Sequence, residues 1–245
     1  MILSLAPEVT EIKEVYDFLS ENLKPWTKDL DEHARTASQD VHWVTLPWLA
    51  LLINRYFGNQ RIHELYLSTI FSLLYFSDHI HGKVLDDQEG QSCNQTLQFS
   101  ILLGDLIFGK AIQLLLKMDE FELLPYMTSL IAHANEGHVI SRKTGADDLD
   151  TIGLEKALYY KTLFLTASII GGCSGRELKL YEDIGYSLGM VITLQDRGMS
   201  AKSLPYLEKA EALLANQRRS NYDKCGLHRM IDELHDGLEI PRAVI

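Results

Sequence analysis

Histidines and carboxylates crowd into one short stretch of the sequence, SDHIHGKVLDD at residues 77–87. If this stretch continues a helix, side chains four positions apart share a face, so an acid at position 82 would stand beside Asp86. Mg²⁺ prefers oxygen ligands and is commonly held by one or two carboxylates together with substrate phosphates. The sequence has Gly82 instead, and it adds Lys83, which can pair with Asp86 or Asp87. The stretch therefore has the spacing of a magnesium clamp without its charge.

The composition describes an acidic chain that does not suit nucleic-acid binding. Its 245 residues include 34 acidic and 23 basic ones, for a net charge of -11. Such a charge repels phosphate backbones unless a basic patch intervenes, and the basic clusters are limited to Arg142-Lys143 and Arg218-Arg219. The length and the lack of linker-like composition predict one domain, residues 1–245.

Nothing in the sequence predicts a membrane-spanning or secreted protein. The N-terminal residues have no positively charged leader, and the apolar run LFLTASIIGGC at 163–173 is shorter than the roughly twenty residues of a membrane span. The three cysteines are too widely spaced for a disulfide framework or a zinc site, which suits a reducing compartment. We therefore expect a cytoplasmic protein that is not integral to a membrane.

The hydrophobic pattern predicts an all-α fold. Apolar residues recur at helical spacing along most of the chain, and no alternation typical of a strand persists. Helices 94–118 and 155–172 are apolar over more than one face, which indicates that other helices surround them. The expected helices cover residues 8–24, 46–57, 60–81, 94–118, 119–143, 149–172, 176–197 and 203–217.

Several motifs, taken in order, resemble one enzyme family. Ile80-His81-Gly82-Lys83-Val84-Leu85-Asp86 resembles the first aspartate-rich motif of the trans-polyprenyl diphosphate synthases, in which an Ile-His pair precedes Asp-Asp-x-x-Asp. Leu103-Gly104-Asp105 resembles the Gly-Asp helix of that family, Lys161-Thr162 its Lys-Thr motif, and LGMVITLQDRGMS at 188–200 the helix of its second aspartate-rich motif. The resemblance covers about residues 42–205. It implies an isoprenoid synthase-type bundle of long antiparallel helices around a central cavity.

The departures from the family pattern concern its charged residues. Gly82 and Lys83 replace the first two aspartates of the first motif, so that Asp86 remains there with its neighbour Asp87. In the second motif Asp196 remains, while Arg197 and Ser200 stand where the other two aspartates would be. The stretch HWVTLP at 42–47 keeps just the proline of the Gly-Lys-Arg-x-Arg-Pro segment that holds isopentenyl diphosphate in the family. Lys161 is read either as the relic of a diphosphate-binding lysine or as a snorkelling side chain.

The resemblance implies that these losses abolish turnover. In the family, magnesium ions held by both motifs ionise an allylic diphosphate, and losing one group that stabilises developing charge commonly costs roughly 3 kcal/mol. We therefore predict no catalytic residue and no metal site in this chain alone, with Mg²⁺ bound by an active partner. The leading hypothesis is a non-catalytic subunit, regulatory or structural, in a heterodimer or larger assembly with a catalytically complete trans-polyprenyl diphosphate synthase.

Other interpretations stay open at this point. A divergent active prenyltransferase could use Asp86, Asp87 and Asp196, and a third class is an isoprenoid-binding or cyclase-like protein. Lys83 and Arg197 are expected either to meet Asp86 and Asp196 in a metal-free cluster or to point into solvent. Helix 94–118 is a candidate contact with the partner or an internal helix. His133 and His138 are assigned to a helix surface and a turn.

Overall fold

The computed structural model describes residues 9–83, 95–145, 148–215 and 226–235, and the regular elements within these ranges are all helical. The predicted all-α class is confirmed. The helices are α1 (Val9–Leu23), α2 (Thr27–Ala37), α3 (Val41–Phe57), α4 (Arg61–Gly82), α5 (Gln95–Lys117), α6 (Leu124–Thr144), α7 (Leu149–Ile152), α8 (Leu158–Ile170), α9 (Arg176–Asp196), α10 (Ser200–Ala215) and α11 (Gly226–His235), with a 3₁₀ turn η2 (Phe121–Leu123) and a π-helical turn η3 (Gly153–Ala157).

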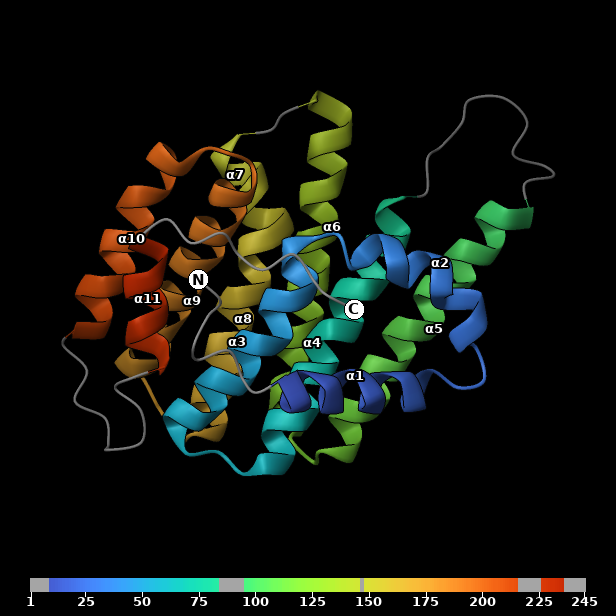
Figure 1. Ribbon diagram of the computed structural model, residues 1–245, viewed down its shortest axis with the longest axis horizontal. Coiled ribbons are helices and arrows are strands. Elements are labelled where there is room, and N and C mark those ends of the chain that lie inside the picture. Colours follow the sequence, from blue (N-terminus) through green and yellow to red (C-terminus); the bar gives the residue numbers. More distant parts are fainter. Residues whose placement is uncertain (1–8, 84–94, 146–147, 216–225, 236–245) are drawn as a thin grey trace.

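Four long helices form the middle of the bundle. Figure 1 shows α3, α4, α8 and α9 between α5 at one end and α10 with α11 at the other. Helix α4 packs on both α3 and α5, and α8 packs on α9. The largest fully buried side chains are aromatic residues of these central helices, including Phe71, Tyr75, Tyr160 and Phe164. Because burying such a side chain contributes roughly 1.5–3 kcal/mol, this aromatic layer fixes how the central helices pack.

Two glycines let α8 and α9 approach closely. A Cβ atom at Gly185 would lie 2.5 Å from the Tyr160 carbonyl oxygen, and one at Gly189 would lie 2.8 Å from the Ala157 Cα. Neither position has room for a methyl group, because real Cβ contacts are longer than these distances. The spacing of four residues places both glycines on one face of α9. That face therefore fixes how α9 presents its C-terminal end to η3.

Helix α3 begins before the residue that the sequence predicted. The carboxylate of Asp40 accepts a hydrogen bond from the backbone N–H of His42 at 3.0 Å, so the helix starts at Val41 and not at residue 46. Pro47 then lies inside the helix, where it cannot donate to the carbonyl of Trp43. The hydroxyl of Tyr16 donates to that carbonyl at 3.0 Å. A side chain from α1 thus replaces the missing backbone bond, which sequence spacing could not reveal.

Other boundaries also differ from the prediction. Helices α2 and α11 were not predicted; α2 buries just Leu30 and Ala37, whereas α11 buries an apolar stripe that includes Met230 and Leu234. The segment expected as one helix at 149–172 is divided by the π turn η3, and α6 starts at Leu124 with Pro125 in its first turn instead of at 119. One stretch of α5, Gln98–Lys117, is long and apolar enough to cross a membrane by length and composition. A single such helix is weak evidence, since core helices of water-soluble proteins pass the same test.

Replacing Gly185 by alanine tests the close α8–α9 contact. We expect Gly185→Ala to lower the free energy of unfolding by about 1–3 kcal/mol, because the added methyl group overlaps the Tyr160 carbonyl. Gly109→Ala is the matched control, since nothing lies within 4 Å of its added Cβ and alanine is favoured in a helix by up to about 1 kcal/mol. In urea denaturation, the midpoint should fall for Gly185→Ala and should stay the same or rise for Gly109→Ala. Equal shifts of the two midpoints would contradict the close contact between α8 and α9.

Candidate functional site

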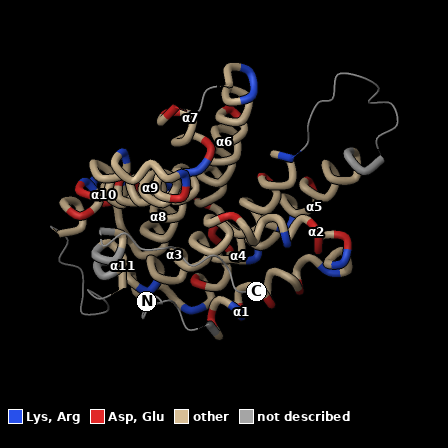
Figure 2. Tube along the Cα trace, turned by 45° about the horizontal axis from the view of Figure 1, so that its top comes forward, with Lys and Arg blue, Asp and Glu red and all other residues tan. Residues whose placement is uncertain are grey.

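The ends of the two motif helices are linked by side chains from two further elements, α6 and η3. Helix α4 carries the first degenerate motif and α9 the second, while η3 packs against both α9 and α6. Figure 2 shows acidic and basic positions next to each other where α9 approaches α7. The site is therefore built of opposite charges from elements far apart in sequence.

The first motif is described as far as Lys83. Gly82 is the last residue of α4 and is exposed, and Lys83 caps the helix. The ammonium group of Lys83 donates a hydrogen bond to the hydroxyl of Thr36 on α2. Burial lowers the pKa of Lys83 below its ordinary value, while the charge of Glu32 opposes this effect. The predicted contact of Lys83 with Asp86 or Asp87 lies outside the described residues.

In the second motif, the basic residue Arg197 lies close to a carboxylate. Asp196 ends α9 and is exposed, and Ser200 begins α10. The guanidinium of Arg197 lies 4.0 Å from a carboxylate oxygen of Glu155 on η3. The sequence left two alternatives for Arg197, a cluster with Asp196 or a side chain in solvent; the ion pair found here is with Glu155, a residue that the sequence pattern did not single out. Sequence spacing could not reveal this pair, because Glu155 lies some forty residues before Arg197 in the chain.

Lys161, the predicted diphosphate-binding relic, lies in the seam between α8 and α9. Its ammonium group is 3.5 Å from a carboxylate oxygen of Glu182 on α9. Another lysine reaches the ends of α3 and α4: Lys156 of η3 donates to the hydroxyl of Tyr75 at 3.2 Å and lies 4.6 Å from the centre of its ring. The Tyr75 hydroxyl in turn donates to Asp40 at 2.5 Å. The proposed role of Lys161 stays a prediction, and Lys156 is the lysine that contacts α4.

Two landmarks of the sequence resemblance meet in space. The Nε2 atom of His81 lies 3.2 Å from a carboxylate oxygen of Asp105 and 3.3 Å from the carbonyl oxygen of Ile101. The ring of His81 covers Gly104, where an added Cβ would lie 2.2 Å from Nε2. The Ile-His pair and the Gly-Asp pair are thus two halves of one contact between α4 and α5. Glycine is needed at 104 because the imidazole occupies the space of a side chain.

Four charged side chains that the sequence did not connect form a continuous network across the site. His138 of α6 lies with Nε2 2.8 Å from Asp78 Oδ1 and with Nδ1 3.3 Å from Glu155 Oε1. The assignment of His138 to a turn was wrong, because α6 continues to Thr144. The side chain of His138 therefore projects from a helix and faces α4 and η3. We call this set the ion-pair network; its members are Asp78 of α4, His138 of α6, Glu155 of η3 and Arg197, the residue that follows α9.

The protonation state of His138 follows from its two carboxylate partners. Hydrogen bonds to Asp78 and then to Glu155 raise the pKa of His138 to about 9, against the opposing effect of burial. The imidazole is therefore a cation at neutral pH. Burial raises the pKa of Glu155, but the contact with His138 and the nearby charges of Lys156 and Arg197 outweigh it, so this pKa lies below its ordinary value. The network thus alternates negative, positive, negative and positive charges.

A neutral histidine lies deeper in the same region. Burial lowers the pKa of His42 to about 3, so the ring is uncharged at neutral pH. The Thr45 hydroxyl donates to the Val41 carbonyl at 3.0 Å and accepts from the hydroxyl of Tyr160 at 2.5 Å. The Nδ1 atom of His42 then donates to the same Tyr160 oxygen at 2.6 Å. These bonds join α3 to α8 where the family's isopentenyl diphosphate segment would lie, and they use neutral groups.

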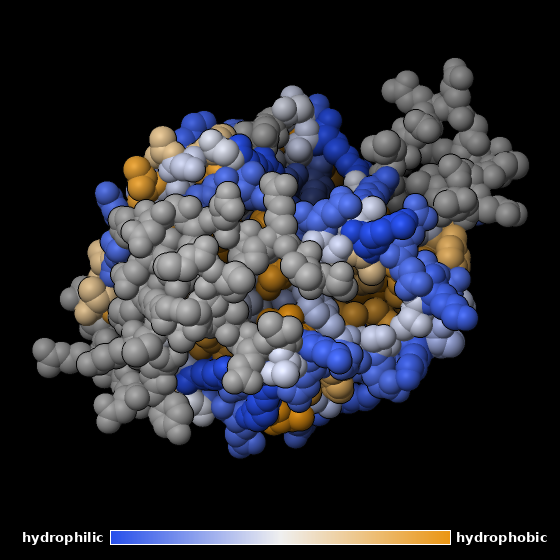
Figure 3. Space-filling model, in the orientation of Figure 1, coloured by the Kyte–Doolittle hydropathy of each residue, from blue (hydrophilic) through white to orange (hydrophobic). Residues whose placement is uncertain are grey.

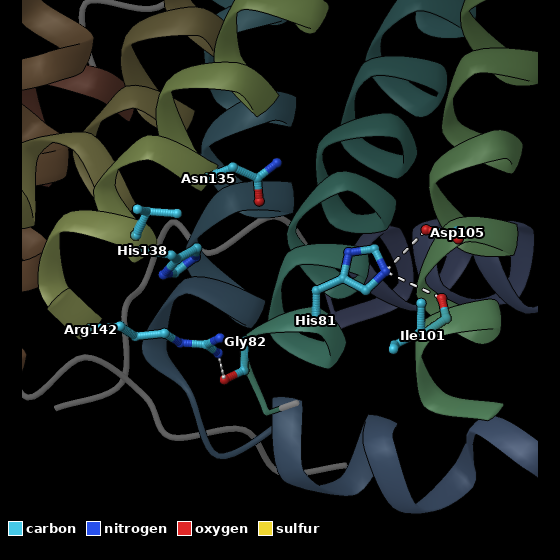
Figure 4. A pocket seen from close by; sticks show the side chains of 8 residues that line it. His81, Gly82, Ile101, Asp105, Asn135, His138 and Arg142 are labelled. Carbon is cyan, nitrogen blue, oxygen red and sulfur yellow. Dashed lines mark hydrogen bonds and ion pairs between the residues drawn. The ribbon is translucent and has the colours of Figure 1, made fainter. Parts of the chain in front are cut away.

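A pocket of about 360 Å³ opens between α4, α5 and α6. Figure 4 shows Asn135, His138 and Arg142 of α6 on one side and His81 with Asp105 on the other. Arg142 donates to the carbonyl oxygen of Gly82 at 2.8 Å and so satisfies one of the free carbonyls at the end of α4. The polar groups at this pocket wall thus hold the end of the first motif helix.

The described residues do not fit a magnesium ion. The buried carboxylates of this region, Asp78 on α4 and Glu155 on η3, already have cationic partners. Lys83 and Arg197 add positive charge at positions where metal ligands would be expected, and a divalent ion would be repelled by them. Among the residues that the structure describes, no three histidine, cysteine or carboxylate side chains are grouped to hold a metal ion.

The chain has recognisable relatives among curated proteins. It is 27% identical over 202 residues to decaprenyl-diphosphate synthase subunit 2 of Schizosaccharomyces pombe, with 77% of this chain and 67% of that protein aligned. It is 24% identical over 163 residues to octaprenyl diphosphate synthase of Escherichia coli, with 61% of this chain and 50% of that protein aligned. The chain thus spans about two thirds of the first relative and half of the second. No family model matches it.

Solved structures give the same result for the fold. A decaprenyl diphosphate synthase from Rhodobacter capsulatus superimposes with a TM-score of 0.74 at 15% identity, covering 93% of this chain and 94% of that one. The chain is similar in sequence to polyprenyl diphosphate synthases and has the isoprenoid synthase fold. The small subunit of geranyl diphosphate synthase from Antirrhinum majus superimposes with a TM-score of 0.67 at 15% identity, covering 93% and 95% of the two chains. The bundle that the motifs implied is therefore confirmed.

The raised pKa of His138 predicts a stability that falls with pH. Because the folded protein holds this proton more tightly than the unfolded chain, the stabilisation is fully present below pH 6.5, decreases above it and is lost as pH passes about 9. The shift corresponds to about 3 kcal/mol. Urea denaturation at several pH values should give a shallower decline for His138→Gln than for the unmodified protein. His133→Gln, on the exposed side of the same helix, is the control and should keep the original slope; parallel curves for all three proteins would contradict the assignment.

Proposed function

We propose that this chain is a non-catalytic subunit, regulatory or structural, of a heterodimeric or larger trans-polyprenyl diphosphate synthase. The observation that carries the proposal is the presence of Lys83 and Arg197 where the family resemblance implies metal-binding aspartates. Arg197 contacts Glu155, so its charge is part of the site. Stabilisation of a departing diphosphate depends on metal ions that these cations would repel. In the proposed assembly, Mg²⁺ and turnover belong to a partner with complete motifs.

The names of two similar proteins support a subunit role. The Schizosaccharomyces pombe relative is named as subunit 2 of decaprenyl-diphosphate synthase, and the Antirrhinum majus structure is a small subunit of geranyl diphosphate synthase. Both names describe a chain that works within an assembly. We place the proposed assembly in the cytoplasm, in keeping with the three widely spaced cysteines of this chain.

An apolar surface on α5 supplies a docking surface for the partner. We call it the α5 face and define it by Phe99, Leu102 and Leu116, whose exposed fractions are 41%, 64% and 44%. The opposite side of α5 packs on α4, so α5 lies at the edge of the bundle (Figure 1). Figure 3 shows apolar surface at the same edge of the molecule. Exposed apolar patches of this kind commonly mark protein interaction sites, which favours helix 94–118 as the contact.

An activity assay with and without a partner tests the proposal. The purified chain is incubated with Mg²⁺, an allylic diphosphate and labelled isopentenyl diphosphate. We expect no prenyl product from this chain alone, since the loss of several charge-stabilising groups costs about two to three decades of rate for each group. Addition of the full-motif synthase of the same organism should give product at a higher rate, or of a different chain length, than that synthase alone. Robust condensation by the chain alone would establish the divergent prenyltransferase instead.

A charge placed on the α5 face tests the docking surface. Leu102→Glu should reduce association with the co-expressed full-motif synthase at least tenfold, because an acid in an apolar interface must be desolvated. Leu204→Glu on α10 is the matched control, since Leu204 is 49% exposed at the other end of the bundle and should leave binding unchanged. The measurement is the dissociation constant by calorimetry. Equal affinities for both variants would exclude the α5 face, and self-association lost in Leu102→Glu would indicate a homodimer.

A further inference from the structure

The two motif helices are joined here through protein side chains of alternating charge. Starting from α4, Asp78 contacts His138 at 2.8 Å, and His138 contacts Glu155 at 3.3 Å. Glu155 then lies 4.0 Å from Arg197 at the end of α9. We propose that the ion-pair network joins α4 to α9 in place of divalent cations, so that this chain holds its shape without metal or diphosphate. The proposal concerns the chain by itself and assumes nothing about its partner.

Burial makes the members of the ion-pair network dependent on one another. The side chains of Asp78 and Glu155 are 5% and 12% exposed, while those of His138 and Arg197 are 23% and 28% exposed. A carboxylate taken out of water is strongly destabilising unless a cation compensates it. Each buried carboxylate therefore needs the cation beside it. The more exposed cations retain some water and lose less solvation.

The backbone is arranged so that His138 can reach Glu155. An added Cβ at Gly137 would lie 2.9 Å from the Leu154 Cβ and 3.1 Å from the Glu155 backbone nitrogen. Glycine at this position thus lets α6 lie directly against η3. The π turn then presents Glu155 to α6, whereas the next residue, Lys156, contacts Tyr75 on α4. A close approach and an irregular turn at the same point indicate that the contact is a built feature of the fold.

A divalent ion and the ion-pair network exclude each other. Mg²⁺ would have to bind carboxylates that already face His138 and Arg197, and it would stand close to both cations. Lys156 opposes the charge on His138, while Arg142 lines the neighbouring pocket. A further positive charge among these groups is unfavourable. The network replaces a metal bridge because its cations come from the chain itself.

A double-mutant cycle tests whether Asp78 and His138 act as one unit. Asp78→Asn and His138→Gln should each lower the melting temperature by about 6–12 °C, as expected when a partly buried pair is broken in a chain of this size. The melting temperature of the double variant should not fall below that of the less stable single variant, because both substitutions remove the same contact. Asp183→Asn is the control: its pair with Lys179 is largely exposed, so little change is expected. Additive losses in the double variant would overturn the proposal.

A metal titration of the unmodified chain gives an independent test that needs no variant to fold. Its melting temperature should be the same in EDTA, in Mg²⁺ alone and in Mg²⁺ with inorganic diphosphate. Stabilisation by Mg²⁺ with diphosphate that is lost in Asp196→Asn would show a metal bridge at the second motif and overturn the proposal. Neither test involves the partner, so their failure would leave the proposed subunit role standing, and failure of the partner assay would leave the network intact.

Discussion

A carboxylate that has left water must have a cation beside it, and this constraint shapes the centre of the molecule. Asp78 near the C-terminal end of α4 and Glu155 on η3 are both buried, and His138 compensates both. The close contact of α6 with η3 at Gly137 and the inward turn of His138 both serve that pairing. Arg197 extends the same pattern to α9. The site is therefore stabilised by charges that belong to the protein itself.

The fold was predictable from the sequence because its signals are redundant. Helical periodicity in long segments indicated an all-α bundle, and the order of several motifs implied by resemblance the isoprenoid synthase type, which the solved structures confirm. The contact of His81 with Gly104 and Asp105 illustrates why motif order carried so much information. Each motif is weak by itself, yet the two pairs occur together because one imidazole packs against the other segment. The start of α3 was missed because a tyrosine hydroxyl from α1 compensates Pro47.

The ion-pair network was not predictable from the sequence, for a physical reason. Its members come from four elements, and members in direct contact are between 17 and 60 residues apart along the chain, so no local spacing connects them. The motif positions drew the prediction toward Asp86 and Asp196, whereas Arg197 contacts Glu155, which no motif singles out. The sequence itself carries basic residues at two positions where the resemblance implies aspartates. That difference is the common basis of the proposed subunit role and of the proposed metal-free network.

The π turn η3 has one more consequence for how this site can vary. Within five residues it directs two consecutive side chains of opposite charge, Glu155 and Lys156, to different neighbours. Removing or inserting one residue there would rotate the preceding segment by about 100° on a regular helix and misdirect both side chains together. The contact of Glu155 with α6 and the contact of Lys156 with α4 therefore depend on the same backbone geometry. A substitution can change one of these contacts alone, whereas an insertion or deletion in the turn changes both.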